Sequence, residues 1–220
     1  MSDGSLPNPG SIVAVRSRRE QARPMLWQLI LIVSGLITCF GGDVIAAESR
    51  PIAEARVEDL AGHAERLQFG SQVKAVVFLF VCVECPISNS YAPEFKRLGA
   101  EFGSRNVLFK LVYPNVDESA DTIRKHLKEF GLSMPALRDP WHDLVKAADV
   151  NTTPEAAVFV PQSGFVYHGR IDNRYADLGV ARPEATQHDL KEALTAILEG
   201  KSVARKSARA IGCSIPPLPR

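Results

Sequence analysis

Two cysteines follow directly on a strongly apolar run, and this junction constrains the fold more than any other part of the chain. Residues 73–81 read VKAVVFLFV, a pattern typical of a strand buried on both faces. Cys82 and Cys85 come next, and Pro86 then begins a segment with apolar residues at helical spacing. The cysteine pair is therefore predicted to lie at a strand-to-helix turn.

The segments after this turn predict further strands and helices. In the first helix the apolar stripe falls at Tyr91, Phe95, Leu98 and Phe102, and Pro93 predicts an irregular first turn or a kink. The later elements are a strand (106–113), a helix capped by Ser119, a short helix, a hairpin (156–160 and 165–171) and a helix that starts at a capping box (186–189).

The first 47 residues have the pattern of a signal peptide. Four arginines precede an apolar run over 25–40, and the small residues Val44 and Ala46 follow at the spacing of a cleavage site. We therefore expect residues 1–47 to be removed and the protein to be exported, to the periplasm or the extracellular space. The alternative is an uncleaved membrane anchor, for which the run is shorter than the ~20 apolar residues of a span.

The charge balance argues against one class of partner. The chain has 26 Lys and Arg against 25 Asp and Glu, so it lacks the basic excess that binding of nucleic acid requires. The one stretch of a single sign is a basic, proline-containing C-terminal tail (201–220), which we interpret as solvated. The chain then consists of a signal peptide (1–47), one globular domain (48–200) and this tail.

The number of cysteines indicates that their disulfide pairing is incomplete or changes during function. Cys39 belongs to the signal peptide, which leaves Cys82, Cys85 and Cys213 in the exported part. Disulfides persist outside the cytoplasm, but three cysteines form no closed framework. One thiol is therefore free, or the pairing changes during function.

The element order, the C-x-x-C at a strand end and Thr153-Pro154 before the hairpin resemble the thioredoxin fold. More narrowly, CPISNSYAPE (85–94), GRIDNRY (169–175) and Gly212-Cys213 resemble exported bacterial redoxins of the peroxiredoxin-like branch, the alkyl hydroperoxide reductase and thiol-specific antioxidant proteins. The match covers about residues 55–215. It implies an α/β, thioredoxin-like fold with a central mixed sheet flanked by helices.

The resemblance also implies a thiol-disulfide oxidoreductase. Cys82 would attack a substrate disulfide and Cys85 would resolve the mixed disulfide, while Thr153-Pro154 would be the cis-proline position that binds an extended substrate. Partners would be protein or small-molecule disulfides and thiols with an external electron donor, and no cofactor or metal is expected. The negative charge of Glu84 opposes formation of a thiolate at the pair. We therefore expect a reduction potential typical of a reducing or isomerising protein rather than of a strong oxidant.

The peroxiredoxin-like branch assigns the roles differently. Its peroxidatic cysteine precedes a proline, as Cys85 does, and follows a threonine by three residues, where this chain has Cys82. Because Pro86 suits a first helical position, Cys85 would be the more acidic thiol, and Cys213 could resolve its sulfenic acid. A thiol peroxidase and a redox-silent binding module, in which C-x-x-C is only a clip, remain as alternatives.

Metal binding by histidine is not expected. The histidines never occur as a close pair, and His126 lies between Ile123 and Leu127 on a helix face that we interpret as surface. The cysteine spacing of copper-delivering thioredoxin-like proteins is also absent from the sequence.

Overall fold

The computed structural model describes residues 52–219. The predicted signal peptide lies outside these residues, so its removal stays a prediction. Within the described part, none of the helices has the length and apolar character that crossing a membrane needs.

The described residues form five α-helices, one 3₁₀ helix and twelve strands. The 3₁₀ helix is η1 (Ile52–Glu54), and the α-helices are α1 (Pro86–Ser90), α2 (Ala92–Gly103), α3 (Ala120–Phe130), α4 (Asp143–Ala148) and α5 (Asp189–Leu198). The strands are β1 (Val57–Glu58), β2 (Ala64–Glu65), β3 (Ala75–Phe80), β4 (Val107–Tyr113), β5 (Ala136–Arg138), β6 (Thr152–Thr153), β7 (Glu155–Val160), β8 (Gly164–Gly169), β9 (Tyr175–Asp177), β10 (Val180–Ala181), β11 (Ser207–Ala208) and β12 (Cys213–Ser214).

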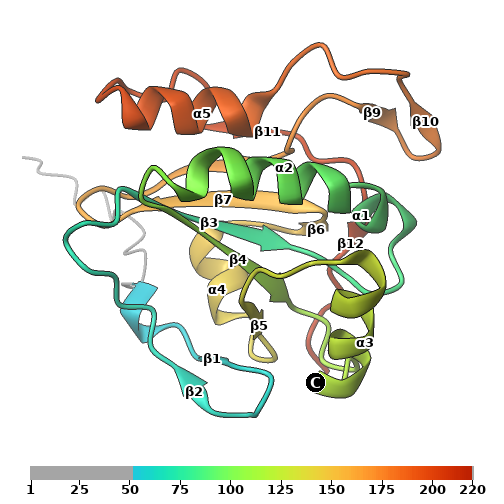
Figure 1. Cartoon of the computed structure of the whole chain (residues 1–220). Helices are drawn as coiled ribbons and strands as arrows, with labels where there is room; N and C mark the ends of the chain where they lie inside the picture. Colours follow the sequence, from blue (N-terminus) through green and yellow to red (C-terminus); the bar gives the residue numbers. More distant parts are fainter. Residues whose placement is uncertain (1–51, 220) are drawn as a thin grey trace, which may run out of the picture. The chain divides into compact units, whose positions relative to one another are not determined.

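One mixed sheet organises these elements, in the order β11-β8-β7-β3-β4-β5-β1-β2 (Figure 1). Strands β3, β4 and β5 run parallel, whereas β7 is antiparallel to β3 and β8 is antiparallel to β7. The two predicted buried strands are confirmed as β3 and β4, and the predicted hairpin is confirmed as β7 and β8. The sheet continues at its edges through β5, β1, β2 and β11, which the sequence analysis did not predict.

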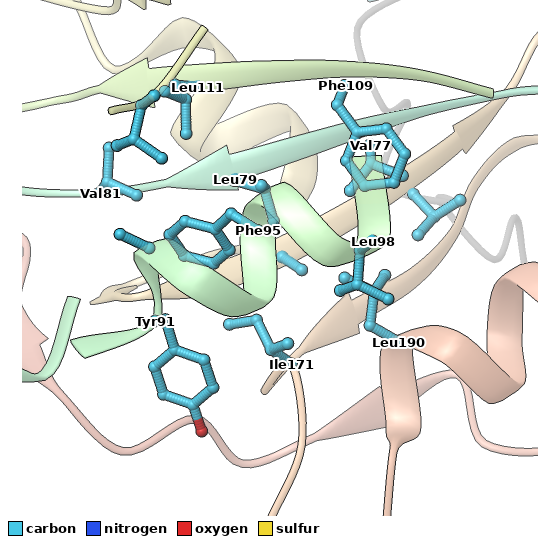
Figure 2. Close-up of a cluster of buried hydrophobic side chains, with 14 of the residues drawn as sticks. Val77, Leu79, Val81, Tyr91, Phe95, Leu98, Phe109, Leu111, Ile171 and Leu190 are labelled. Carbon is cyan, nitrogen blue, oxygen red and sulfur yellow. The ribbon is translucent and has the colours of Figure 1, made fainter. Parts of the chain in front are cut away.

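Strand β3 is buried along its whole length because both faces of the sheet are covered. On one face, Val77 and Leu79 pack in a cluster with Phe95 and Leu98 of α2 and Leu190 of α5 (Figure 2). On the other face, Val76, Phe78 and Phe80 join a second cluster with Leu144 and Val145 of α4. This explains why the strand reads as an unbroken apolar run.

The helix after the cysteines is interrupted, as Pro93 predicted. Helix α1 ends at Ser90 and α2 begins at Ala92, with Tyr91 between them and Pro93 in the first turn of α2. Ser119 caps α3 as expected, because its side chain accepts a hydrogen bond from the Thr122 N–H at 3.1 Å.

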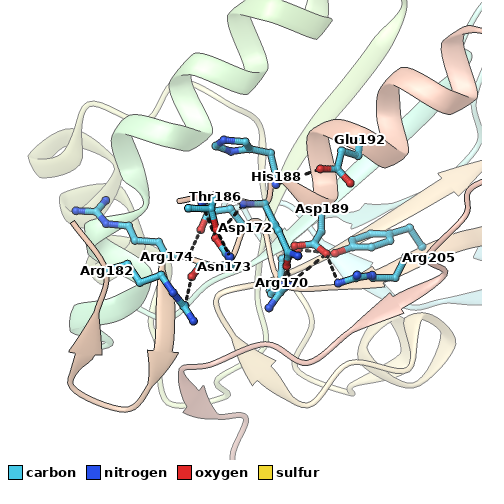
Figure 3. Close-up of polar contacts among 12 residues, drawn as sticks. Arg170, Asp172, Asn173, Arg174, Arg182, Thr186, His188, Asp189, Glu192 and Arg205 are labelled. Carbon is cyan, nitrogen blue, oxygen red and sulfur yellow. Dashed lines mark hydrogen bonds and ion pairs between the residues drawn. The ribbon is translucent and has the colours of Figure 1, made fainter. Parts of the chain in front are cut away.

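The predicted capping box before α5 is wrong. His188 precedes the helix and makes no side-chain cap hydrogen bond. Thr186 is used elsewhere, since its hydroxyl accepts a hydrogen bond from Asn173 Nδ2 at 2.8 Å and its N–H donates to Asn173 Oδ1 at 2.8 Å (Figure 3). The loop before α5 is therefore tied to the segment after β8 rather than to the helix start.

The arrangement is a thioredoxin-like fold. A parallel unit (β3, α1–α2, β4) and an antiparallel unit (β7, β8, α5) share one sheet, and the Thr153–Pro154 peptide bond before β7 is cis. The segment that we interpreted as a solvated tail contributes two strands: β11 pairs with β8, and β12 pairs with β6.

Candidate redox site

Cys85 lies at the predicted strand-to-helix turn, where it is the N-cap residue of α1 and Pro86 begins the helix. Its Sγ accepts a hydrogen bond from the Ser88 N–H at 3.4 Å and donates one to the Thr153 carbonyl at 3.2 Å. The residue is only 1% exposed. These two hydrogen bonds hold the sulfur at the start of a helix, a position typical of reactive cysteines.

A chain of hydrogen bonds fixes the peptide groups of Val83, between the two cysteines. The Val83 N–H donates to Glu118 Oε1 at 2.8 Å, and Asn89 Nδ2 donates to the Val83 carbonyl at 2.9 Å. His126 Nε2 lies 2.9 Å from Asn89 Oδ1, and His126 Nδ1 lies 2.9 Å from the Tyr113 hydroxyl. We call these five residues the Val83 clamp.

The clamp corrects the interpretation of His126 as a surface residue, because its side chain is buried and only 4% of the residue is exposed. Asn89 Oδ1 is an acceptor, so the ring donates from Nε2 and accepts the Tyr113 hydroxyl proton at Nδ1. Burial also lowers the pKa of His126, which favours this neutral ring. The residue therefore has a positioning role in the turn.

Cys82 is half-buried beside an acidic group. Burial, with the charge of Glu118 as the next largest cause, raises the pKa of its thiol to about 12. Glu118 is itself only 6% exposed, burial raises the pKa of its carboxyl group, and its Oε2 has no hydrogen-bond partner among the described residues. A carboxyl group of this kind can share a proton with the neighbouring thiol.

The acidic neighbour that matters for Cys82 is thus different from the one we expected. The Glu84 side chain is exposed, and its backbone N–H lowers the pKa of Cys82. Glu118 was missed because it is distant in sequence and lies in a loop. A signal was available: the loop follows β4, the parallel neighbour of β3, and the carboxyl ends of parallel strands meet at one edge of a sheet.

Cys213 lies beside Cys85, although about 130 residues separate them in the sequence. It is in β12, directly opposite Thr153 in the antiparallel pair with β6, and Thr153 is the residue whose carbonyl accepts the Cys85 thiol. Burial, together with the adjacent Cys85 thiol, raises the pKa of Cys213 to about 11. All three cysteines of the described residues are free thiols.

Thr153 and Pro154 lie next to Cys85, but the expected open position for a substrate is occupied. The chain's own β12 pairs with β6, and the Thr153 hydroxyl donates to the Cys213 carbonyl at 3.4 Å. The backbone of Thr153 is therefore engaged with the C-terminal segment in this structure.

The GRIDNRY motif lies in the polar connection between β8 and α5 (Figure 3). Arg170 forms an ion pair with Asp189 at 2.7 Å, and Arg205 joins the same carboxylate at 2.9 Å. Asp172 accepts the Tyr91 hydroxyl proton at 2.6 Å. These contacts fix α5 and the α1–α2 junction, so the motif supports the site from outside.

One set of side chains has ligand atoms close enough for a metal ion. Glu94, Asp172 and His188 place one such atom each within 4.8 Å of the others. Their carboxylates already serve protein groups, since Glu94 holds Arg97 through both oxygens and Asp172 accepts from Tyr91 and the Arg174 N–H. This chemistry fits an ion-paired surface better than a metal centre.

No family model and no curated protein matches the chain. Among solved structures, it is similar to an uncharacterized conserved protein from Geobacillus kaustophilus, with 27% identity and a TM-score of 0.64, covering 77% of this chain and 94% of that one. A hypothetical protein from Sinorhizobium meliloti 1021 has 23% identity and a TM-score of 0.61, covering 73% and 88%. The MTB dsbF protein, in its mixed oxidized and reduced forms, has 17% identity and a TM-score of 0.49, covering 67% and 98%.

Proposed function

We propose that the protein is a thiol-disulfide oxidoreductase that acts through Cys82 and Cys85. The observation that carries this proposal is the turn itself: a buried helix-cap thiol, Cys85, lies three residues after a half-buried thiol that faces a buried carboxyl group. A permanent structural disulfide does not need a proton acceptor beside one of its sulfurs. The arrangement therefore favours exchange over a redox-silent binding module.

The residues suggest the order of steps. Cys82, the more accessible of the pair, attacks one sulfur of a substrate disulfide and its proton passes to Glu118. Such a base is required because a thiol with a pKa of about 12 holds almost no thiolate near neutral pH. The first substrate sulfur leaves and takes up a proton.

The second step closes the internal bond. Cys85, whose sulfur is held at the start of α1 by the Ser88 N–H, attacks the Cys82 sulfur of the mixed disulfide. The bond between Cys82 and the substrate breaks, the Cys82–Cys85 disulfide forms, and the second substrate thiol leaves with the Cys85 proton. The substrate gains two electrons and the protein loses two.

The test is reduction of a disulfide by the protein purified from cells that express the full chain. The pre-reduced protein is mixed with insulin or oxidised glutathione, quenched by alkylation, and mapped by mass spectrometry. Wild type should form a Cys82–Cys85 disulfide, and Cys82→Ser and Cys85→Ser should each slow substrate reduction by at least about a hundredfold. Substrate reduction by both active-site variants at the wild-type rate would disprove the proposal.

A second candidate function is peroxide reduction at Cys85. The contact between Cys213 and Cys85 favours it, because a sulfenic acid on Cys85 would meet a thiol at once. Hydrogen peroxide in place of the disulfide distinguishes the two. Faster formation of a Cys85–Cys213 bond with peroxide than of a Cys82–Cys85 bond with oxidised glutathione would favour the peroxidase.

The setting of the reaction is proposed on sequence grounds. A chain exported by residues 1–47 would act outside the cytoplasm and would need an external electron donor, with protein or small-molecule disulfides as substrates. Fractionation of cells that express the full chain, followed by N-terminal sequencing, tests this directly. A cytoplasmic protein that retains its N-terminus would contradict it.

A further inference from the structure

The C-terminal segment passes directly over the buried sulfur of Cys85. We call residues 207–215 the strap. Its first part, β11, pairs with β8, and its last part, β12, pairs with β6, while the Ile215 N–H donates to the Asn151 carbonyl at 2.9 Å. The pairing of β12 with β6 places Cys213 opposite Thr153 and beside Cys85. Cys213 is partly exposed, whereas Cys85 is almost fully buried.

The close approach of the strap depends on Gly212. A Cβ atom at this position would lie 2.0 Å from the Thr153 carbonyl oxygen and 3.0 Å from Pro154 Cδ. Only a residue without a side chain allows the backbone to come this near. The chain is therefore shaped at residue 212 to bring the next residue, Cys213, against the turn.

The strap is attached at few points. Each of its two strands pairs over two residues only. A cavity of about 560 Å³ lies along residues 207–212, and its other walls include Asp149, Glu155 and His168. Short pairings over an open polar cavity hold the strap less firmly than a long strand pairing would, and its other contacts with the core are those of Ile211, Cys213 and Ile215 with the two apolar clusters.

We propose that Cys213 is a third redox thiol, which takes over the disulfide from Cys82 and presents it to an external dithiol. This inference rests on the proposed function, because it starts from the Cys82–Cys85 disulfide which that reaction leaves. Cys85 is then the central sulfur, shared between an inner partner, Cys82, and an outer partner, Cys213. An electron donor reaches the partly exposed Cys213 and has no need to reach Cys85.

The exchange balances in two steps. First, the Cys213 sulfur attacks the Cys85 sulfur, the Cys82–Cys85 bond breaks, and Cys82 takes up a proton in place of the one that Cys213 lost. Second, one thiol of the external dithiol attacks Cys213 and its other thiol closes the donor's own disulfide. Cys85 and Cys213 leave as thiols, so the donor loses two electrons and the protein gains two.

The surroundings of Cys82 favour the first step. Cys82 is the leaving sulfur, and Glu118 beside it can supply the proton that completes its departure. Burial and the Glu118 charge both raise the pKa of Cys82, so the sulfur would be a poor leaving group as a bare thiolate and this proton is needed for its departure.

The test separates reduction of the substrate from reduction of the protein. Wild type, Cys213→Ser and Cys213→Ala, each purified from cells that express the full chain, are oxidised with oxidised glutathione and then reduced with dithiothreitol. Both variants should be reduced at least about tenfold more slowly than wild type, while their pre-reduced forms should reduce oxidised glutathione within about twofold of the wild-type rate. Ser214→Ala, the neighbouring exposed strap residue, serves as the control and should match wild type in both assays.

Mapping by mass spectrometry supplies a second readout that does not depend on rates. Oxidised wild type should contain Cys85 bonded to Cys82 in some molecules and to Cys213 in others, and Cys82→Ser should form the Cys85–Cys213 bond alone. Wild-type reduction rates in the folded Cys213 variants, or no Cys85–Cys213 bond in Cys82→Ser, would overturn the inference. A pre-reduced wild type that fails to reduce oxidised glutathione would instead overturn the proposed function.

Discussion

The Val83 clamp and the strap both meet the cysteines, yet they are held in place by different means. The clamp uses buried and half-buried side chains from α1, α3, the end of β4 and the loop after it, joined by hydrogen bonds of 2.8–2.9 Å. The strap uses short backbone pairings above a cavity. The difference shows that one flank of Cys85 is built to stay fixed, whereas the other is built to be displaced at small cost.

The largest effect should come from breaking the fixed flank. Asn89→Ala leaves the Val83 carbonyl and His126 Nε2 without partners, and should lower the free energy of unfolding by about 3 kcal/mol. Urea titration measures this loss. His126→Ala should cost a similar amount, and the double variant should cost less than the sum because both changes break one chain of bonds. Strict additivity would show that the clamp is not a unit.

The next largest effect should come from lifting the strap. In Gly212→Ala the new methyl group would overlap the Thr153 carbonyl, so the strap must move at a cost of about 1–3 kcal/mol. Formation of the Cys85–Cys213 bond in the Cys82→Ser background should fall by at least about tenfold. Gly70→Ala is the matched control, since a Cβ there meets nothing within 4 Å. Equal disulfide yields in the two alanine variants would show that the strap is not held by close contact at residue 212.

A smaller effect should follow from removing the charge at Cys82. Glu118→Gln keeps an acceptor for the Val83 N–H but removes the carboxylate that raises the thiol pKa, so this pKa should fall by about one unit from about 12. Alkylation of Cys82 by iodoacetamide across a pH series measures the shift. Glu84→Gln is the control, because that side chain is exposed and should leave the Cys82 pKa unchanged. If the Cys82 pKa fell only in Glu84→Gln, Glu84 rather than Glu118 would be the residue whose charge raises it.

The same substitution should alter how stability depends on pH. Burial raises the pKa of Glu118, so the folded chain holds this proton more firmly than the unfolded chain does. The resulting stability is present at low pH and is lost as the pH rises through the folded-state pKa. Glu118→Gln should therefore lose less stability than wild type over that interval, as thermal unfolding at several pH values would measure.

The smallest effect should come from one weak contact of the strap. Thr153→Val keeps the shape of the side chain but removes the 3.4 Å hydrogen bond to the Cys213 carbonyl, which should cost about 0.5 kcal/mol. Amide hydrogen exchange in β12 should become faster, while exchange in α1 stays as it was. Faster exchange in both elements would show that strap and turn open together.

The contrast between contacts made by neighbouring residues and contacts made by distant ones explains which features the sequence could predict. The strand, the turn and the helix around Cys82 and Cys85 follow from local patterns, because apolar spacing and the Pro86 position act over a few residues. The break at Tyr91 was likewise marked by Pro93. These elements are fixed by neighbours along the chain, so they can be identified without a three-dimensional structure.

The missed features depend on contacts between distant residues. His126 was interpreted as surface because helical periodicity does not show that a buried tyrosine hydroxyl lies opposite it. Glu118 and Cys213 reach the site only through the pairing of β3 with β4 and of β6 with β12. The last 20 residues, basic and rich in proline, gave no periodic pattern from which β11 and β12 could be predicted.

The position of Cys213 so far from Cys85 in the chain also links redox state to resistance against unfolding. In the chain-entropy view, a bond between Cys82 and Cys85 closes a ring of four residues and stabilises the folded state by only about 2 kcal/mol. A bond between Cys85 and Cys213 closes a ring of about 130 residues and is worth about 5 kcal/mol in the same view. Transfer of the disulfide from Cys82 to Cys213 would thus stabilise the whole domain against unfolding, and reduction by the donor would remove that stabilisation.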